Sequence, residues 1–161
     1  MNNHAHYPSI SGKVVFITGG ASGIGRAMVK AFAAQAAKIA FIDINNEAAQ
    51  SLIASLPNAK LWFRQVDVTD SNALQQSLVD ACAELGAINV LVNNVANDRR
   101  QASEDVTVQD WDQCLQINLN PAFFASQVAM SFMKSEGAGS IINFSSINAI
   151  MGQPQMAGYV T

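Results

Sequence analysis

Three glycines and one aspartate carry the spacing with the clearest chemical meaning in this chain. Gly19, Gly23 and Gly25 follow an apolar run, and Asp43 ends the next apolar run 18 residues after Gly25. Glycine lets a ligand approach the backbone closely, and the first turn of a helix presents N–H groups without partners. A pyrophosphate fits there, and an acid at the next strand end can accept ribose hydroxyls. The pattern predicts a dinucleotide site formed by Gly19, Ser22, Gly23, Ile24, Gly25 and Asp43.

The residues on either side of the glycines predict the elements that must position this site. Lys13–Thr18 reads as a strand, residues 26–37 carry apolar side chains at helical spacing, and Lys38–Asp43 reads as a second strand. A glycine-rich turn alone is weak evidence, because many such turns bind nothing. The order strand, turn, helix, strand and acid favours a nucleotide site over an ordinary strand-to-helix turn.

The rest of the chain continues the alternation of strands and helices. Helices are predicted over Asn45–Leu56, Ser71–Leu85 with Asp70 as N-cap, and Val108–Met133 with a kink at Pro121. Strands are predicted over Leu61–Val66, Ile88–Asn93 and Ser140–Ser145, with loops over Asn94–Asp105 and from the fifth strand to Tyr159. We therefore expect an α/β fold, a doubly wound parallel sheet in the strand order 3-2-1-4-5.

Composition limits the classes of partner. The chain has 161 residues, of which 50% are hydrophobic and 13% charged, which predicts one globular domain over residues 13–161 after a polar tail over residues 1–12. The net charge of -3 gives no reason to expect nucleic acid or a membrane as partner. Cys82 and Cys114 fall in predicted helices, so we expect free thiols and a cytoplasmic protein. His4 and His6 stand in the tail without a further ligand, and we expect no metal site.

Several short motifs appear in sequence order at the predicted strand ends. Thr18 opens a T-G-x-x-x-G-x-G arrangement, Asn93-Asn94 forms a pair, Asn118 lies in the long helix, and Ser146 and Tyr159 stand 13 residues apart. From Lys13 onward these motifs resemble those of the classical short-chain dehydrogenase/reductase family. The resemblance implies a Rossmann-type fold. It also implies that Asp67 and Val68 contact the adenine of the cofactor and that Asn94 borders the cofactor.

The same resemblance assigns three residues to catalysis. Ser146 would hydrogen-bond the substrate oxygen, Tyr159 would take or give its proton, and Asn118 would hold a water molecule in a proton relay. A tyrosine in water ionises near pH 10, so a tyrosine base needs positive charge beside it. The family supplies that charge from the oxidised nicotinamide and from a lysine four residues after the tyrosine. Structural alternatives stay open: a helix cap for Asp67, a structural role for Asn118, a loop hydroxyl for Ser146 and a buried ring for Tyr159.

A polar loop departs from the family pattern. Val95-Ala96 stands where the family usually has Ala-Gly, and the missing glycine restricts the backbone. The loop continues with Asn97, Asp98 and Arg99, which resemble the corresponding loop of short-chain sugar dehydrogenases that oxidise aldoses. We expect these three residues to bind substrate, and a solvated charged loop is the open alternative.

These residues together predict an NAD-dependent oxidoreductase that oxidises a hydroxyl of a sugar or another secondary alcohol to a carbonyl or lactone. Asp43 would repel the 2′-phosphate of NADP, and neither Ser22 nor Ile44 offers a positive charge to it. The sequence ends at Thr161, before the expected lysine. We therefore expect the amino-terminal part of an enzyme, inactive as 161 residues alone, whose parent is a homo-oligomer. A reductase of 3-oxoacyl or other keto substrates and a nucleotide-binding fragment without turnover are the alternatives.

Overall fold

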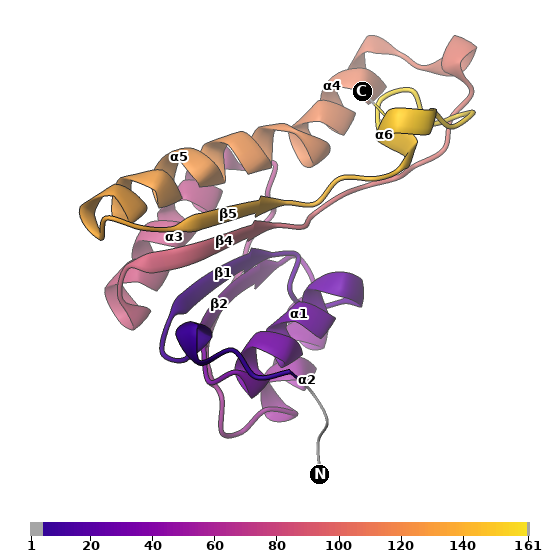
Figure 1. Ribbon diagram of the computed structural model, residues 1–161. Helices are drawn as coiled ribbons and strands as arrows, with labels where there is room; N and C mark the ends of the chain where they lie inside the picture. The colour runs from indigo at the N-terminus through magenta and orange to yellow at the C-terminus, as the bar shows by residue number, and fades with distance from the viewer. Residues whose placement is uncertain (1–4, 161) are drawn as a thin grey trace.

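Five parallel strands form a sheet at the centre of the structure, a computed structural model that describes residues 5–160 (Figure 1). The strands are β1 Val14–Thr18, β2 Lys38–Asp43, β3 Lys60–Gln65, β4 Ile88–Asn93 and β5 Ser140–Asn143. Their order is β3-β2-β1-β4-β5, and each neighbouring pair is parallel. The predicted doubly wound sheet is therefore confirmed. Residues 1–4 of the predicted tail, with His4, and Thr161 lie outside the described residues.

Helices cover both faces of this sheet. α1 Gly23–Ala34 and α2 Asn46–Ala54 pack on one face, and α3 Ser71–Leu85 and α5 Asn120–Ser135 pack on the other (Figure 1). α4 Val108–Asn118 extends past the carboxyl ends of the strands, and the short α6 Asn148–Met151 lies at the same end (Figure 1). Two short 3-10 helices, Pro8–Ile10 and Ser103–Asp105, lie in connecting segments.

The central strands are buried on both faces, which explains their unbroken apolar sequence. Val15, Ile17 and Phe41 pack against α1 and α2, whereas Phe16 and Leu91 pack against α3 and α5, and all five are fully buried. Each fully buried side chain of this kind stabilises the fold by roughly 1.5–3 kcal/mol. The carboxyl ends of β1, β2 and β4 are thereby held at one edge of the sheet.

The helix predicted as one kinked element over residues 108–133 is two helices, so that prediction is wrong. α4 ends at Asn118, and Leu119 follows with φ −114° and ψ −56° before α5 begins. Pro121 lies in the first turn of α5, where its missing N–H would have no helical partner in any case. Since proline cannot donate to the carbonyl of Ile117, the chain breaks the helix rather than bending it. Asn118 therefore lies at a helix end and not inside a helix.

The segment after the fifth strand also differs from the expected loop. β5 ends at Asn143, two residues before the predicted end, and α6 occupies residues 148–151. The Ser146 hydroxyl accepts a hydrogen bond from the Asn148 amide at 3.2 Å, next to the start of this helix. A helix of one turn is too short to show an apolar period in the sequence.

The other helix ends follow from local backbone chemistry. α1 begins at Gly23 rather than at residue 26, and it ends at Ala34 because Ala36 has a left-handed φ of +59°. The predicted N-cap of α3 is confirmed, since the Asp70 carboxylate accepts a hydrogen bond from the Ala73 amide at 2.9 Å.

The described part of the predicted tail is tied to the end of α1. The Gln35 side chain accepts a hydrogen bond from the Tyr7 amide at 2.8 Å and donates one to the Ala5 carbonyl at 3.0 Å. The Gly12 amide donates to the Ala36 carbonyl at 2.9 Å.

Candidate functional site

The glycine turn after β1 brings the start of α1 close against the end of the strand. Gly19 has φ +68°, and a Cβ on Gly25 would lie 1.9 Å from the Gly19 carbonyl oxygen. A Cβ on Gly20 would lie 2.6 Å from the Cβ of Phe41, so this glycine lets the turn pack on β2. The sequence did not single out Gly20. Any side chain at Gly20 or Gly25 would push the turn out of place.

Gly23 differs from these two glycines because it faces open space. Its φ is +50°, and a Cβ there would meet nothing within 4 Å. The Ser22 side chain makes no capping hydrogen bond to α1. The first amides of α1 therefore open onto the surface with the positive end of the helix dipole, which is an environment that suits an anion.

A cleft of about 600 Å³ opens in front of these amides. We call it the glycine cleft, and its volume is in the usual range for a ligand pocket. Eight of the predicted cofactor residues line it: Gly19, Ser22, Gly23, Ile24, Asp43, Asp67, Val68 and Asn94. Gly25 does not line it, because it is buried beneath the turn. Residues that the sequence did not indicate complete the lining, among them Thr69, Gln113 and Gln116.

The Asp43 carboxylate is fixed in the glycine cleft by two backbone amides. One oxygen accepts a hydrogen bond from Ala21 and the other from Asn45, both at 2.9 Å. Asp67 also lines the cleft, and its carboxylate accepts the amide and the hydroxyl of Thr69 at 2.9 and 2.8 Å. Asp70, not Asp67, caps α3. The cleft thus carries two carboxylates, at the ends of neighbouring strands.

Asn94 holds the glycine turn against β4. Its side-chain amide donates to the carbonyls of Thr18 and Gly19 at 3.1 and 3.2 Å, and its backbone amide donates to the Thr18 hydroxyl at 3.0 Å. Val95 lies over the same turn, where its Cγ2 would be 2.9 Å from a Cβ on Gly19. Ala96 lines the glycine cleft and does not adopt a positive φ. At the two positions where the family has Ala-Gly, Val95 therefore packs on the glycine turn, and Ala96 fits because its backbone is not left-handed.

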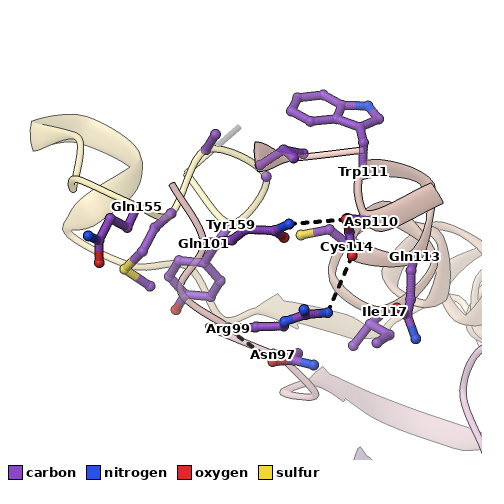
Figure 2. Close-up of a pocket in the computed structure, with 14 residues that line it drawn as sticks. Asn97, Arg99, Gln101, Asp110, Trp111, Gln113, Cys114, Ile117, Gln155 and Tyr159 are labelled. Carbon is purple, nitrogen blue, oxygen red and sulfur yellow. Dashed lines mark hydrogen bonds and ion pairs between the residues drawn. The ribbon is translucent and has the colours of Figure 1, made fainter. Parts of the chain in front are cut away.

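A second, smaller cleft lies around Tyr159, as Figure 2 shows. We call it the tyrosine cleft. It has a volume of about 50 Å³ and shares Asn97, Gln113 and Ile117 with the glycine cleft, so the two clefts adjoin along α4. A space of that size holds only one or two water molecules.

The other two predicted catalytic residues lie in hydrogen-bonded positions nearby. The side-chain oxygen of Asn118 accepts a hydrogen bond from the Asn97 backbone N–H at 2.7 Å. The side-chain nitrogen of Asn118 donates to the Asn97 carbonyl and the Cys114 sulfur, each at 3.1 Å. Its side chain therefore fixes the loop at Asn97. Ser146 lines neither cleft. It is linked to the Tyr159 segment through Asn148, whose side-chain nitrogen lies 3.9 Å from the Met156 sulfur. The Met156 carbonyl accepts a hydrogen bond from the Tyr159 backbone N–H at 3.0 Å.

The predicted substrate residues are separated by the fold. Asn97 lines both clefts, Arg99 lines the tyrosine cleft, and Asp98 lines neither and is exposed. Arg99 forms an ion pair with Asp110 at 3.4 Å. Asp110 was not predicted as a site residue, although Thr107 three residues before it forms a capping box with it, a pattern that is visible in the sequence.

Asp110 lines the tyrosine cleft and accepts several hydrogen bonds. Its carboxylate accepts the Thr107 hydroxyl at 2.6 Å, the Gln101 side-chain amide at 3.1 Å and the Thr107 backbone amide at 3.2 Å. These bonds, led by the one from the Thr107 hydroxyl, lower the pKa of Asp110 to about 2, and the charge of Arg99 acts in the same direction. The carboxylate is therefore ionised throughout the neutral range.

Comparison with known proteins places this geometry in a family. The sequence model described as short chain dehydrogenase matches residues 13–161. The chain belongs to the short-chain dehydrogenase family, and the resemblance seen in the motifs is confirmed.

The relatives include proteins named for action on sugars and polyols. A probable galactose dehydrogenase, GalD, of Rhizobium meliloti is 41% identical over 98% of this chain and 62% of its own length. A D-xylose 1-dehydrogenase of Caulobacter vibrioides is 38% identical with the same coverage. A D-threitol dehydrogenase of Mycolicibacterium smegmatis is 37% identical over 93% of this chain and 58% of its own length.

Solved structures agree with the fold. A double mutant of a Serratia marcescens short-chain dehydrogenase/reductase has a TM-score of 0.88 at 32% identity, covering 96% of this chain and 63% of its own. The structure of levodione reductase has a TM-score of 0.86 at 26% identity, covering 93% and 60% of the two chains. The chain thus spans about three fifths of the length of the relatives that it matches.

Over residues 5–160, no group of three or more His, Cys, Asp or Glu side chains could hold a metal ion. None of the described helices is long and apolar enough to cross a membrane. Cys82 and Cys114 are free thiols, half-buried in α3 and α4, and burial raises the pKa of the Cys82 thiol.

Proposed function

We propose that this protein is an NAD-dependent dehydrogenase that oxidises a hydroxyl of a sugar or another secondary alcohol. The observation that carries the proposal is the position of Asp43, which is held by the Ala21 and Asn45 amides in the cleft that the start of α1 opens onto. A carboxylate there suits two ribose hydroxyls and disfavours the extra phosphate of NADP. The residues present fit a dinucleotide, because Gly23 leaves room in front of unpartnered amides.

Each chemical step is then assigned to residues of this chain. The amides at the start of α1 bind the pyrophosphate, Asp43 holds the ribose, and Asp67 and Val68 contact the adenine. The nicotinamide, when bound, supplies the acceptor for the hydride. Tyr159 takes the hydroxyl proton, Ser146 orients the substrate oxygen, and Asn118 supports the relay of the proton to solvent.

The proposal that the substrate is a sugar rests on the relatives and on the lining of the clefts. Several relatives are named for galactose, xylose or threitol. Asn97 and Gln113 line the region where the two clefts adjoin, and amide side chains supply both donors and acceptors to hydroxyls. A site built to pair several hydroxyls discriminates against apolar alcohols, because each buried polar group left unpaired costs about 1–3 kcal/mol.

Cofactor choice is the first test. Titration of the whole protein with NAD and NADP should show tighter binding of NAD. Asp43→Asn, which keeps the size of the side chain but removes its charge, should narrow the preference, and Asp43→Ala should do the same. Asp67→Asn is the matched control for the preference: it removes a charge from the same cleft at another strand end and should leave the ratio of the two affinities unchanged. Tighter binding of NADP by the unaltered protein would overturn the assignment of NAD.

Substrate choice is the second test. The whole protein with NAD is screened against aldoses, polyols and simple secondary alcohols, and aldoses should be oxidised fastest. Asp98→Ala should lower sugar turnover, whereas Glu104→Ala, at an exposed acid that lines neither cleft, should not. If no sugar reduces NAD and a keto substrate is reduced instead, the protein is a reductase and the sugar assignment is wrong.

Three further properties belong to the same proposal. The enzyme is cytoplasmic, a proposal supported by its two free cysteines. It is a homo-oligomer, because α5 exposes Phe123 and Met130 on its surface. The polypeptide of 161 residues alone does not turn substrate over.

A further inference from the structure

A backbone hydrogen bond joins the segment that carries Tyr159 to the loop after β4. The Gln101 amide donates to the Gln155 carbonyl at 2.7 Å. Gln155 has a φ of +65°, a left-handed backbone conformation that residues other than glycine adopt only at a cost in free energy. A backbone held in such a conformation persists only when its surroundings fix it, so the bond from Gln101 matters more here than in an unstrained turn.

Gln101 is itself fixed at its side chain. Its amide nitrogen donates to the Asp110 carboxylate at 3.1 Å and to the Asp105 carbonyl at 2.9 Å. Figure 2 shows Gln101 and Arg99 both reaching toward Asp110, with Tyr159 beside them. With its side chain bound at both acceptors, residue 101 presents its backbone N–H to Gln155 in one orientation.

Asp110 anchors this arrangement to α4. It also accepts the Thr107 hydroxyl and pairs with Arg99. α4 carries Cys114, whose sulfur would be 2.8 Å from a Cβ on Gly158, the residue before Tyr159. The tyrosine segment therefore approaches α4 directly at Gly158 and is tied to α4 through Gln101 at Gln155.

We propose that Gln101, clamped by Asp110, is a positioning residue that sets the place of Tyr159 relative to α4 and the glycine cleft. The inference rests on the proposed function, in which Tyr159 exchanges a proton with the substrate. Gln101 lines the tyrosine cleft as well, but its side-chain amide is bound to the Asp110 carboxylate and the Asp105 carbonyl. It acts through the Gln155 carbonyl and the turn that follows.

The main test uses Gln101→Leu in the whole protein, because leucine fills a similar volume but cannot donate to Asp110. We expect kcat to fall on the order of tenfold, since a small misplacement of a catalytic group has effects of that size or larger. The KM for NAD should stay unchanged, because the glycine cleft does not include Gln101. Amide hydrogen exchange over residues 155–160 should be faster in the variant.

Asp110→Asn is the second variant, and it tests the same arrangement without a change at residue 101. It weakens the hold on Gln101 and should raise exchange over the same segment. Asp112→Asn removes an equal charge from the exposed side of α4 and should change neither readout. Thr107→Ala removes the cap of α4 but leaves the Gln101 and Arg99 contacts to Asp110, so it should lower stability without the fall in kcat.

The outcomes separate the inference from the proposed function. If the unaltered protein oxidises no alcohol, the proposed function fails, and faster exchange in Gln101→Leu still supports the tie between Gln101 and the tyrosine segment. Unchanged exchange over residues 155–160 in both Gln101→Leu and Asp110→Asn overturns the inference. Equal falls in kcat for Gln101→Leu and Thr107→Ala overturn it as well, because general support of α4 would then explain the effect.

Discussion

Gly23 and Gly25 stand two residues apart in one turn, yet a side chain at each position would meet different surroundings. At Gly25 a Cβ would lie 1.9 Å from the Gly19 carbonyl oxygen, a backbone atom that cannot move alone. At Gly23 it would meet nothing within 4 Å of the protein. The missing side chain at Gly23 therefore leaves space for a ligand, whereas the missing side chain at Gly25 allows α1 to pack against the Gly19 carbonyl.

Alanine substitutions should separate these two roles. Gly25→Ala should lower the free energy of unfolding by about 1–3 kcal/mol or more, as overpacking does. Gly23→Ala should cost about 1 kcal/mol for its positive φ but should weaken NAD binding strongly, because Gly23 lines the glycine cleft. Denaturant melts and NAD titrations of both variants are the measurements. Equal losses of stability with unchanged NAD binding by Gly23→Ala would contradict the assignment of the turn.

Asp110 is predicted to give the protein a pH-dependent increment of stability. Hydrogen bonds, first of all from Thr107, lower its pKa from 3.8 to about 2 in the folded protein. A carboxylate with a depressed folded pKa stabilises the fold above its unfolded pKa, and that contribution disappears as pH falls through the folded value. The difference in melting temperature between the unaltered protein and Asp110→Asn should therefore be largest above about pH 4 and shrink toward pH 2. A difference that stays constant over that range would show that the carboxylate charge is not responsible.

The contact between α3 and α5 depends on small side chains. Ala81 of α3 and Ala125 and Ala129 of α5 are fully buried in the core on that face of the sheet. Small residues let two helices approach closely, and interiors packed at crystal-like density have no room for more atoms. α5 in turn carries the chain from α4 to β5.

Ala129→Leu should therefore destabilise the protein by about 1–3 kcal/mol, the usual cost of overpacking. Ser131→Leu, which adds the same side chain to the exposed side of α5, should change the free energy of unfolding by less than about 0.5 kcal/mol. Denaturant unfolding of both variants gives the comparison. Similar values for the two would mean that the α3–α5 contact can open without cost.

All four residues of β5 are exposed in the part of the chain that the structure describes. Ile142 is 43% exposed and Phe144 47% exposed, and Ile142 pairs with Val92, whose side chain faces the α1 side of the sheet. Apolar side chains exposed along an edge strand promote association with other chains.

We predict that a polypeptide of these 161 residues, prepared alone, binds NAD but shows no turnover. The glycine cleft lies away from β5, whereas the lysine that the family resemblance places four residues after Tyr159 is not among these residues. Intact mass, size-exclusion chromatography, NAD titration and turnover should be compared with those of the whole protein. Ile142→Thr should reduce association without changing NAD affinity. Comparable turnover by the short polypeptide, at verified mass, would refute this prediction.

Local pattern was sufficient for most of the fold and for the glycine cleft. The strand from Lys13, the glycines and Asp43 are close in sequence, and parallel strands joined by helices bring their carboxyl ends to one edge. Once the alternation of strands and helices was recognised, the sheet order and the grouping of Gly19, Asp43, Asp67 and Asn94 followed.

The surroundings of Tyr159 depend on contacts between distant segments. The hydrogen bond from Gln101 to Gln155 and the approach of Gly158 to Cys114 join residues more than forty positions apart, and no short-range pattern encodes such pairs. The end of α4 at Asn118 likewise depended on whether Pro121 would bend a helix or begin a new one. Hydrophobic spacing reports which side of an element is buried, but the partner of a polar side chain is chosen only when packing has set the distances between elements.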